Sequence, residues 1–430
     1  MGQCGRMSRL SSIAVAAAVA ILAILIVVVA ATHLSGTRVA GRPTASPAPS
    51  ASLEPSGSAA VSPSQSLEPQ VVFSRIEGQV RDLRGLPAPD IGPVELIGRT
   101  QLEDELKASF EEDYPKAQQR ADNITLHALG LLTGDQDVAA LQLELLSGQV
   151  IGFYDDKKQR MVVVSDAGVD AQAEVTYAHE YTHALQDGSF GLDSLQLDAV
   201  GEDDRSLARL ALVEGDATAV MLQWMLGNLT PAEMQGITET PIPDTSDIPD
   251  WMLAQLLFPY DAGFQFVTSL GGGLGGDYTR VNDAFRSNPP ASTEQVMHID
   301  KYTAHEGPMP VVAPDPAAAL GTGWTQVSST TMGEAMVGIT LDGLGASGDT
   351  AAAAAGWGGD RLVAASGPDD AFALVWRLKW DTAADADEFA TAYGSVTLAM
   401  PHRLVRVADD EVLVLQASSE AALDGLAAVR

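Results

Sequence analysis

Apolar residues recur along the first two thirds of the chain at intervals of three and four positions, which is the spacing of amphipathic helices. One such segment begins after Asp170, a suitable N-cap, and the following Gly188 is placed to end it. Residues 155–158 are polar and lie between two β-rich runs, so a hairpin is expected there. The expected helices cover residues 101–132 (one or two helices), 170–186, 203–226 with Gly227 after it, 251–270, and a segment that starts at the N-cap Ser292.

The pattern changes after about residue 310, where short apolar runs of strand type become frequent. Strands are expected at 361–366, 371–380, 403–408 and 411–418, and helices at 384–396 and 419–429. The order strand-strand-helix, given twice, predicts a C-terminal α+β unit over residues 310–430. The preceding 71–309 is expected to be mostly helical with a small sheet, so the fold class of the chain is α+β.

The N-terminal region differs from the rest of the chain in amino-acid composition. Residues 13–31 form an uncharged apolar run of 19 residues, which as a helix covers roughly 28 Å, about one membrane core. We interpret it as a transmembrane signal anchor, with residues 1–12 as a short cytoplasmic end and 32–70 as a disordered Pro/Ser/Ala linker. The rest would then lie outside the cytoplasm on a single-pass anchor. Cleavage after residue 31, giving a secreted protein, is the other interpretation.

Charge and cysteine content exclude one class of partner and one kind of cross-link. The chain has 57 acidic and 25 basic residues and a formal net charge of −32. Nucleic-acid phosphates would be repelled by such a surface, so we expect no nucleic-acid partner. Cys4 is the one cysteine, and an intramolecular disulfide is therefore excluded.

The stretch AHEYTHALQD, residues 178–187, carries the clearest chemical signal. His179 and His183 are four residues apart, so on a helix both imidazoles project from one face. Zinc binds imidazole nitrogens, and a glutamate beside the first histidine can reach a zinc-activated water. This HExxH arrangement predicts one catalytic Zn²⁺ with Glu180 as the general base. Two hydrogen-bonded core histidines are the alternative interpretation.

A third protein ligand is expected from the helix at 203–226. Glu214 shares a face there with apolar residues, and a carboxylate in such surroundings is costly unless a cation neutralises it. We therefore predict that Glu214 is the third metal ligand. Asp216 is the competing residue, but it points to a different face of the helix. Gly215 would allow another backbone to approach closely.

Three segments together resemble a known family. HEYTHALQD, ALVEGDAT and PPASTEQVMH resemble exported bacterial neutral zinc metallopeptidases, within the gluzincin branch of the zincins, over residues 149–302. The resemblance implies a zincin-like peptidase domain, zinc on His179, His183 and Glu214, and a protein or peptide substrate. The thermolysin-like pattern has Asn and Asp where Val213 and Thr218 stand here. The partner of a ligand histidine is thus unassigned, with Asp187 and Asp216 as the candidates.

The oxyanion-stabilising group is less clearly marked by the sequence. His298 and Tyr302 are four apart on one expected helix and are predicted as catalytic donors, with Tyr177 and Tyr260 as competitors. In related zincins an extended substrate pairs with an edge strand before the motif helix. Residues 161–165 are the candidate for that strand, and an internal strand is the alternative.

The expected function is therefore a membrane-anchored zinc metalloendopeptidase. A zincin-fold module that binds metal at the cell surface without cleaving peptides is the alternative. The intact Glu180 favours the enzyme.

Overall fold

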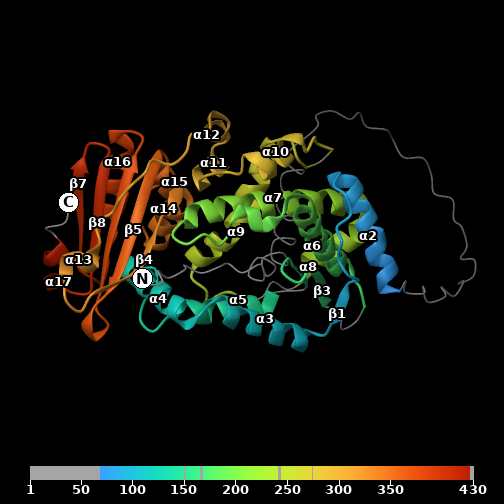
Figure 1. The fold of residues 1–430 in the computed structure, drawn as a ribbon, viewed down its shortest axis with the longest axis horizontal. Coiled ribbons are helices and arrows are strands. Elements are labelled where there is room, and N and C mark those ends of the chain that lie inside the picture. Colours follow the sequence, from blue (N-terminus) through green and yellow to red (C-terminus); the bar gives the residue numbers. More distant parts are fainter. Residues whose placement is uncertain (1–67, 150–151, 165–167, 241–243, 274, 427–430) are drawn as a thin grey trace, which may run out of the picture.

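The computed structural model describes residues 68–149, 152–164, 168–240, 244–273 and 275–426. The predicted signal anchor at 13–31, the cytoplasmic end and almost all of the linker lie outside these residues. Among the residues that are described, no helix is both long enough and apolar enough to cross a membrane. The predicted α+β class is confirmed, with a helical body and a five-stranded sheet side by side along the long axis (Figure 1).

The helical body is centred on two long helices, α7 and α9, which pack against each other along much of their length. The expected segment 101–132 is two helices, because Pro115 separates them. The helices are α2 (Pro69–Arg84), α3 (Arg99–Asp113), α4 (Lys116–Leu129), α5 (Val138–Gln149), α6 (Ala171–Phe190), α7 (Asp203–Asn228), α8 (Pro231–Glu239), α9 (Asp250–Ser269), α10 (Thr279–Ser287), α11 (Thr293–Met297) and α12 (Ile299–Ala304).

A three-stranded sheet lies beside α6 and contains β1 (Glu95–Ile97), β2 (Gly152–Asp155) and β3 (Arg160–Val164). The expected hairpin at 155–158 is confirmed, since β2 and β3 pair antiparallel around it. The strand order is β1-β3-β2, with β1 parallel to β3. The prediction of an edge strand at 161–165 is therefore wrong, because β3 is the central strand and β2 and β1 are the edges.

The C-terminal part forms an antiparallel sheet of order β4-β5-β6-β8-β7. The predicted strands and helices after residue 357 are all present, whereas the polar strand β4 and the helices near it were not predicted. The larger of two clusters of buried apolar residues includes side chains from both the helical body and this sheet, and the smaller one lies between β6, β8 and α17. The elements are α13 (Pro316–Leu320), β4 (Thr325–Thr330), α14 (Gly333–Gly343), α15 (Thr350–Ala354), β5 (Trp357–Ser366), β6 (Phe372–Trp380), α16 (Ala383–Gly394), β7 (His402–Ala408), β8 (Glu411–Ala417) and α17 (Glu420–Leu426).

Two buried carboxylates bind donors from neighbouring elements, one within the helical body and one within the C-terminal part. Asp204, in the first turn of α7, accepts hydrogen bonds from the backbone and hydroxyl of Thr293 at 2.8 and 2.6 Å. Asp360 of β5 accepts the indole N–H groups of Trp357 and Trp376 at 3.0 and 2.9 Å, and the backbone N–H groups at the start of α14. Burial raises the pKa of Asp204 to about 7, although the two bonds from Thr293 lower it.

Candidate metal centre

The motif helix α6 begins as the sequence predicts, because the Asp170 side chain accepts the backbone N–H of Ala173. It does not end at Gly188. The helix continues to Phe190, and Gly191 ends it by adopting a φ of 70° with its N–H on the carbonyl of Asp187. The extra turn keeps residues 179–187 well inside a regular helix, so the two motif histidines share one face. In the same way α7 runs past Gly227 to Asn228.

The three predicted ligands converge. His179 and His183 have their Nε2 atoms 3.0 Å apart, and Glu214 Oε2 lies 3.2 Å from the first and 3.5 Å from the second. Two donors held about 2.0–2.1 Å from one ion in a tetrahedron are about 3.3 Å apart, so these separations fit a single zinc ion. All three side chains are buried, at 0%, 7% and 1% exposure in that order.

A close helix crossing sets the position of the third ligand. Gly215 of α7 meets Gly263 of α9 so tightly that a Cβ at 215 would lie 2.1 Å from the Gly263 carbonyl. The prediction that Gly215 permits close backbone approach is thus confirmed. Tyr260 lies one turn before Gly263, and its buried hydroxyl hydrogen-bonds Glu214. Its ring centroid is 6.2 Å from that of His179. Tyr260, one of the weighed competitors, is therefore the tyrosine next to the predicted ligands.

The general-base candidate is held at one oxygen only. Glu180 Oε2 accepts the backbone N–H of Tyr154, on the edge strand β2, at 3.0 Å. Its other oxygen, Oε1, is buried and has no hydrogen-bond partner among the described residues. Burial raises the pKa of Glu180 to about 7, although the nearby His183 lowers it. A carboxylate with a pKa near neutrality is well suited to exchange protons with a substrate.

The charges of the ligand side chains depend on one another. Burial raises the pKa of Glu214, but the two histidines outweigh it and bring the pKa down to about 2. Burial lowers the pKa of His179, and this effect prevails there. At His183, burial is outweighed by the charge of Glu214, which raises the pKa to about 9. A positive charge beside Glu214 is thus strongly favoured, and a metal ion would supply it in place of the His183 proton.

The histidine His183 has a partner that the sequence did not suggest. Its Nδ1 lies 3.0 Å from Gln186 Oε1, and the Gln186 amide nitrogen reaches the carbonyl of Val213 at 3.0 Å and Asp216 Oδ2 at 2.9 Å. Asp216 in turn accepts Arg84 Nε, from the end of α2, at 2.8 Å, and both side chains are fully buried. Of the two candidates for the histidine's partner, Asp216 acts only through this glutamine.

Asp187 has other contacts. It accepts the Tyr154 hydroxyl at 3.0 Å and the Gln159 amide at 2.6 Å, which ties the β2–β3 hairpin to α6. Among the contacts of the described residues, none joins Asp187 to a ligand histidine. The expectation that Asp187 orients one of them is not supported by these contacts.

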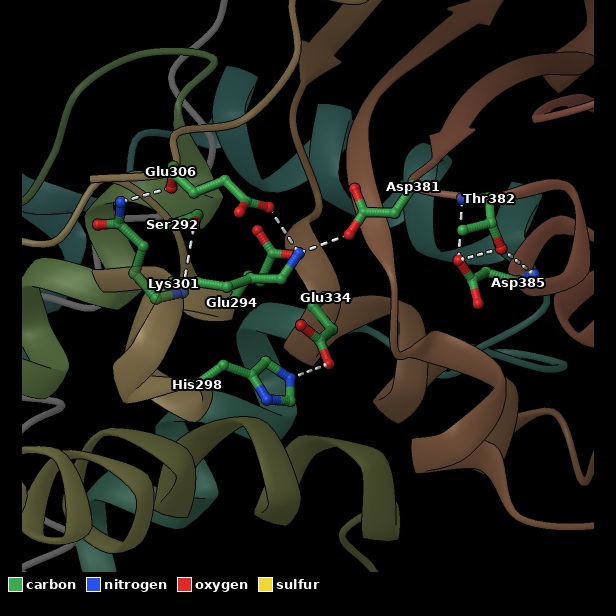
Figure 2. A network of polar contacts seen from close by, with 10 residues as sticks. Ser292, Glu294, His298, Lys301, Glu306, Glu334, Asp381, Thr382 and Asp385 are labelled. Atoms are coloured by element: carbon green, nitrogen blue, oxygen red, sulfur yellow. Dashed lines mark hydrogen bonds and ion pairs between the residues drawn. The ribbon is translucent and has the colours of Figure 1, made fainter. Parts of the chain in front are cut away.

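The structure gives His298 and Tyr302 other roles. The helix expected there is broken at His298 (φ −121°, ψ 94°), so the four-residue spacing no longer places both side chains on one face. His298 Nε2 points at Glu334 Oε1, 2.8 Å away (Figure 2). The Tyr302 hydroxyl donates to the carbonyl of Asn288 at 2.8 Å. Neither residue belongs to the cluster of predicted ligands. Tyr177 donates to Glu77 of α2.

A second group of three acidic side chains lies near His298. Lys301 Nζ is 2.6 Å from a Glu294 oxygen, 2.8 Å from Glu306 and 2.6 Å from Asp381 (Figure 2). The lysine already supplies a cation to these carboxylates. We therefore regard the group as an ion-pair network that joins α11 and α12 to the end of β6.

Comparisons with known proteins bear on the C-terminal part. A family model described as a domain of unknown function (DUF8575) matches residues 322–427. No curated protein and no solved structure matches the chain.

Proposed function

We propose that the chain is a zinc metallopeptidase of the gluzincin type with a zincin-like fold, anchored to the membrane by residues 13–31 and acting outside the cytoplasm. His179, His183 and Glu214 would hold the ion. The proposal is carried by one observation, the convergence of three donor atoms from α6 and α7 at separations of 3.0, 3.2 and 3.5 Å. A buried carboxylate and two buried imidazoles at these distances are what a zinc site requires.

The residues around the ligands can perform peptide hydrolysis. A zinc ion held there would act as a Lewis acid toward the attacking water and the substrate carbonyl. Glu180 accepts a proton from that water through Oε1, for which the described residues offer no hydrogen-bond partner, while the Tyr154 N–H fixes the other oxygen. It then delivers the proton to the leaving nitrogen. The Tyr260 hydroxyl would exchange its hydrogen bond to Glu214 for one to the carbonyl oxygen as negative charge develops there.

A metal-binding module without peptidase activity is the second candidate, and burial favours it. Glu180, the two histidines and Glu214 are each at most 7% exposed. A catalytic zinc site keeps an open coordination position that a substrate must reach, and the burial of these side chains restricts that access.

Purified full-length protein separates these functions. We expect one zinc per chain by elemental analysis, and digestion of a peptide library that stops when 1,10-phenanthroline is added. Glu180→Gln should keep the zinc and lower the hydrolysis rate at least about 100-fold. Absence of zinc from the wild-type protein contradicts both functions. Zinc without peptide cleavage supports the module, and cleavage by Glu180→Gln at the wild-type rate removes Glu180 as the base.

A further inference from the structure

The hydrogen bonds of Gln186 determine which of its ends faces the metal site. Val213 O and Asp216 Oδ2 are both pure acceptors, and both lie within 3.0 Å of the atom assigned as Gln186 Nε2. A carbonyl oxygen at that position would face two other oxygens, so the nitrogen must be there. The amide oxygen therefore faces His183 Nδ1 at 3.0 Å. Gln186 thus presents an acceptor, and only an acceptor, to the histidine.

An acceptor at Nδ1 fixes the form of the imidazole ring. When His183 carries a single proton, that proton must lie on Nδ1, because Gln186 Oε1 can only accept it. The lone pair is then on Nε2, which is the atom directed at His179 and Glu214. Nε2 with a free lone pair is the form of histidine that binds a metal.

Contacts on the side away from His183 fix the Gln186 side chain. Asp216 holds its Nε2 and is paired with Arg84 Nε at 2.8 and 3.0 Å, in a region where neither side chain is exposed. Arg84 also lies over the Tyr278 ring, 4.4 Å from its centroid. A ligand histidine usually donates to a carboxylate or a backbone carbonyl. In this chain, Thr218 stands where the related pattern has an aspartate, and its hydroxyl has no partner among the described residues.

We propose that Gln186 is the positioning residue of the metal centre, and that Asp216 and Arg84 hold it with its amide oxygen toward His183 Nδ1. The inference rests on the proposed zinc site. It explains how a chain without the usual aspartate fixes the orientation and tautomer of a ligand histidine. Gln186 contacts neither substrate nor metal in this role and acts through His183 alone.

Two substitutions at this position separate positioning from a merely structural role. Gln186→Glu keeps an acceptor for His183 but loses the N–H groups that bind Val213 and Asp216. Gln186→Met has a similar volume and loses both the acceptor for His183 and the N–H groups. We expect Gln186→Met to bind zinc about 10–100-fold more weakly than the wild type, as is typical when such a partner is removed. Gln186→Glu should remain within about threefold of the wild type, although both variants lose stability without metal.

Zinc affinity is measured on the full-length protein by competition with a chromogenic chelator, and Co²⁺ absorption spectra report the coordination geometry. Gln416→Met is the control. Gln416 is also a buried glutamine whose side-chain amide donates a hydrogen bond to a backbone carbonyl, but it lies in β8, in the C-terminal sheet. Equal loss of affinity in both Gln186 variants overturns the positioning role and leaves a structural one. Wild-type affinity in Gln186→Met overturns it as well. A wild-type protein that binds no zinc refutes the proposed function itself.

Discussion

Replacing Gly215 with alanine tests how the third ligand is positioned. The added Cβ would lie 2.1 Å from the carbonyl carbon and oxygen of Gly263, whereas ordinary contact begins at 3.4 Å. Helices α7 and α9 must therefore separate by about 1.3 Å, and no side-chain rotation relieves a clash between backbones. Overpacking of this kind costs about 1–3 kcal/mol, against a gain of about 1 kcal/mol from the better helix propensity of alanine. A backbone clash belongs at the upper end of that range.

The same separation moves Tyr260 away from Glu214. Stability is measured by urea unfolding of the metal-free protein, and Gly227→Ala provides the control. Gly227 lies on the same helix, and a Cβ there would meet nothing within 4 Å. We expect Gly227→Ala to be neutral or up to about 1 kcal/mol more stable, and Gly215→Ala to be destabilised by about 1–2 kcal/mol. Equal stability of the two variants would refute the idea that this crossing needs glycine.

Three further predictions follow from the buried polar groups. Removing zinc with a chelator should lower the free energy of unfolding by about 4 kcal/mol relative to protein in zinc at 1,000 times the dissociation constant, and coincident melting curves would contradict the metal site. The raised pKa of Asp204, about 7 when folded against 3.8 normally, means that its proton favours the folded state and that this contribution is lost as pH rises from about 4 to 7. Asp204→Asn should therefore reduce the change in stability over that pH range by up to about 4 kcal/mol. Urea unfolding at each pH gives the free energy of unfolding, and the same change in wild type and variant would contradict this prediction. Trp376→Phe leaves Asp360 without one donor and should cost about 1–3 kcal/mol more than Trp380→Phe, whose indole N–H has no partner among the described residues; equal losses in thermal unfolding would exclude the hydrogen bond as the cause.

The ligands could be predicted from the sequence because each depends on local geometry. His179 and His183 share a face of any regular helix, whatever packs against it. Glu214 was identified by its cost, since a carboxylate on an apolar helix face needs a positive partner. The predicted strand at 161–165 also carries a signal for an internal position in the sheet. Its run of Met and Val does not alternate with polar residues, and this is typical of a strand covered on both faces.

Other parts of the site depend on contacts between distant segments, and no local pattern encodes them. Tyr260 reaches Glu214 because two helices cross at Gly215 and Gly263. The sequence does not indicate that these two glycines, 48 positions apart, lie against each other. Arg84 meets Asp216 across 132 positions of sequence. The four-residue spacing of His298 and Tyr302 was misleading for a related reason, because it assumed a continuous helix where the chain breaks.

Several destabilising features lie close together around Glu214, and this argues that something is bound there. Glycine inside α7 costs about 1 kcal/mol relative to alanine. The neighbouring Glu214 is a buried carboxylate, Asp216 and Arg84 form a buried ion pair, and such pairs contribute little net stability. Glu180 retains a buried oxygen that finds no partner in the part of the chain that the structure describes. A folded protein tolerates conflicts of this kind mainly at functional sites. A divalent cation between α6 and α7 would neutralise Glu214 and accept both imidazole lone pairs, so the metal content of the protein decides more than any measurement of activity.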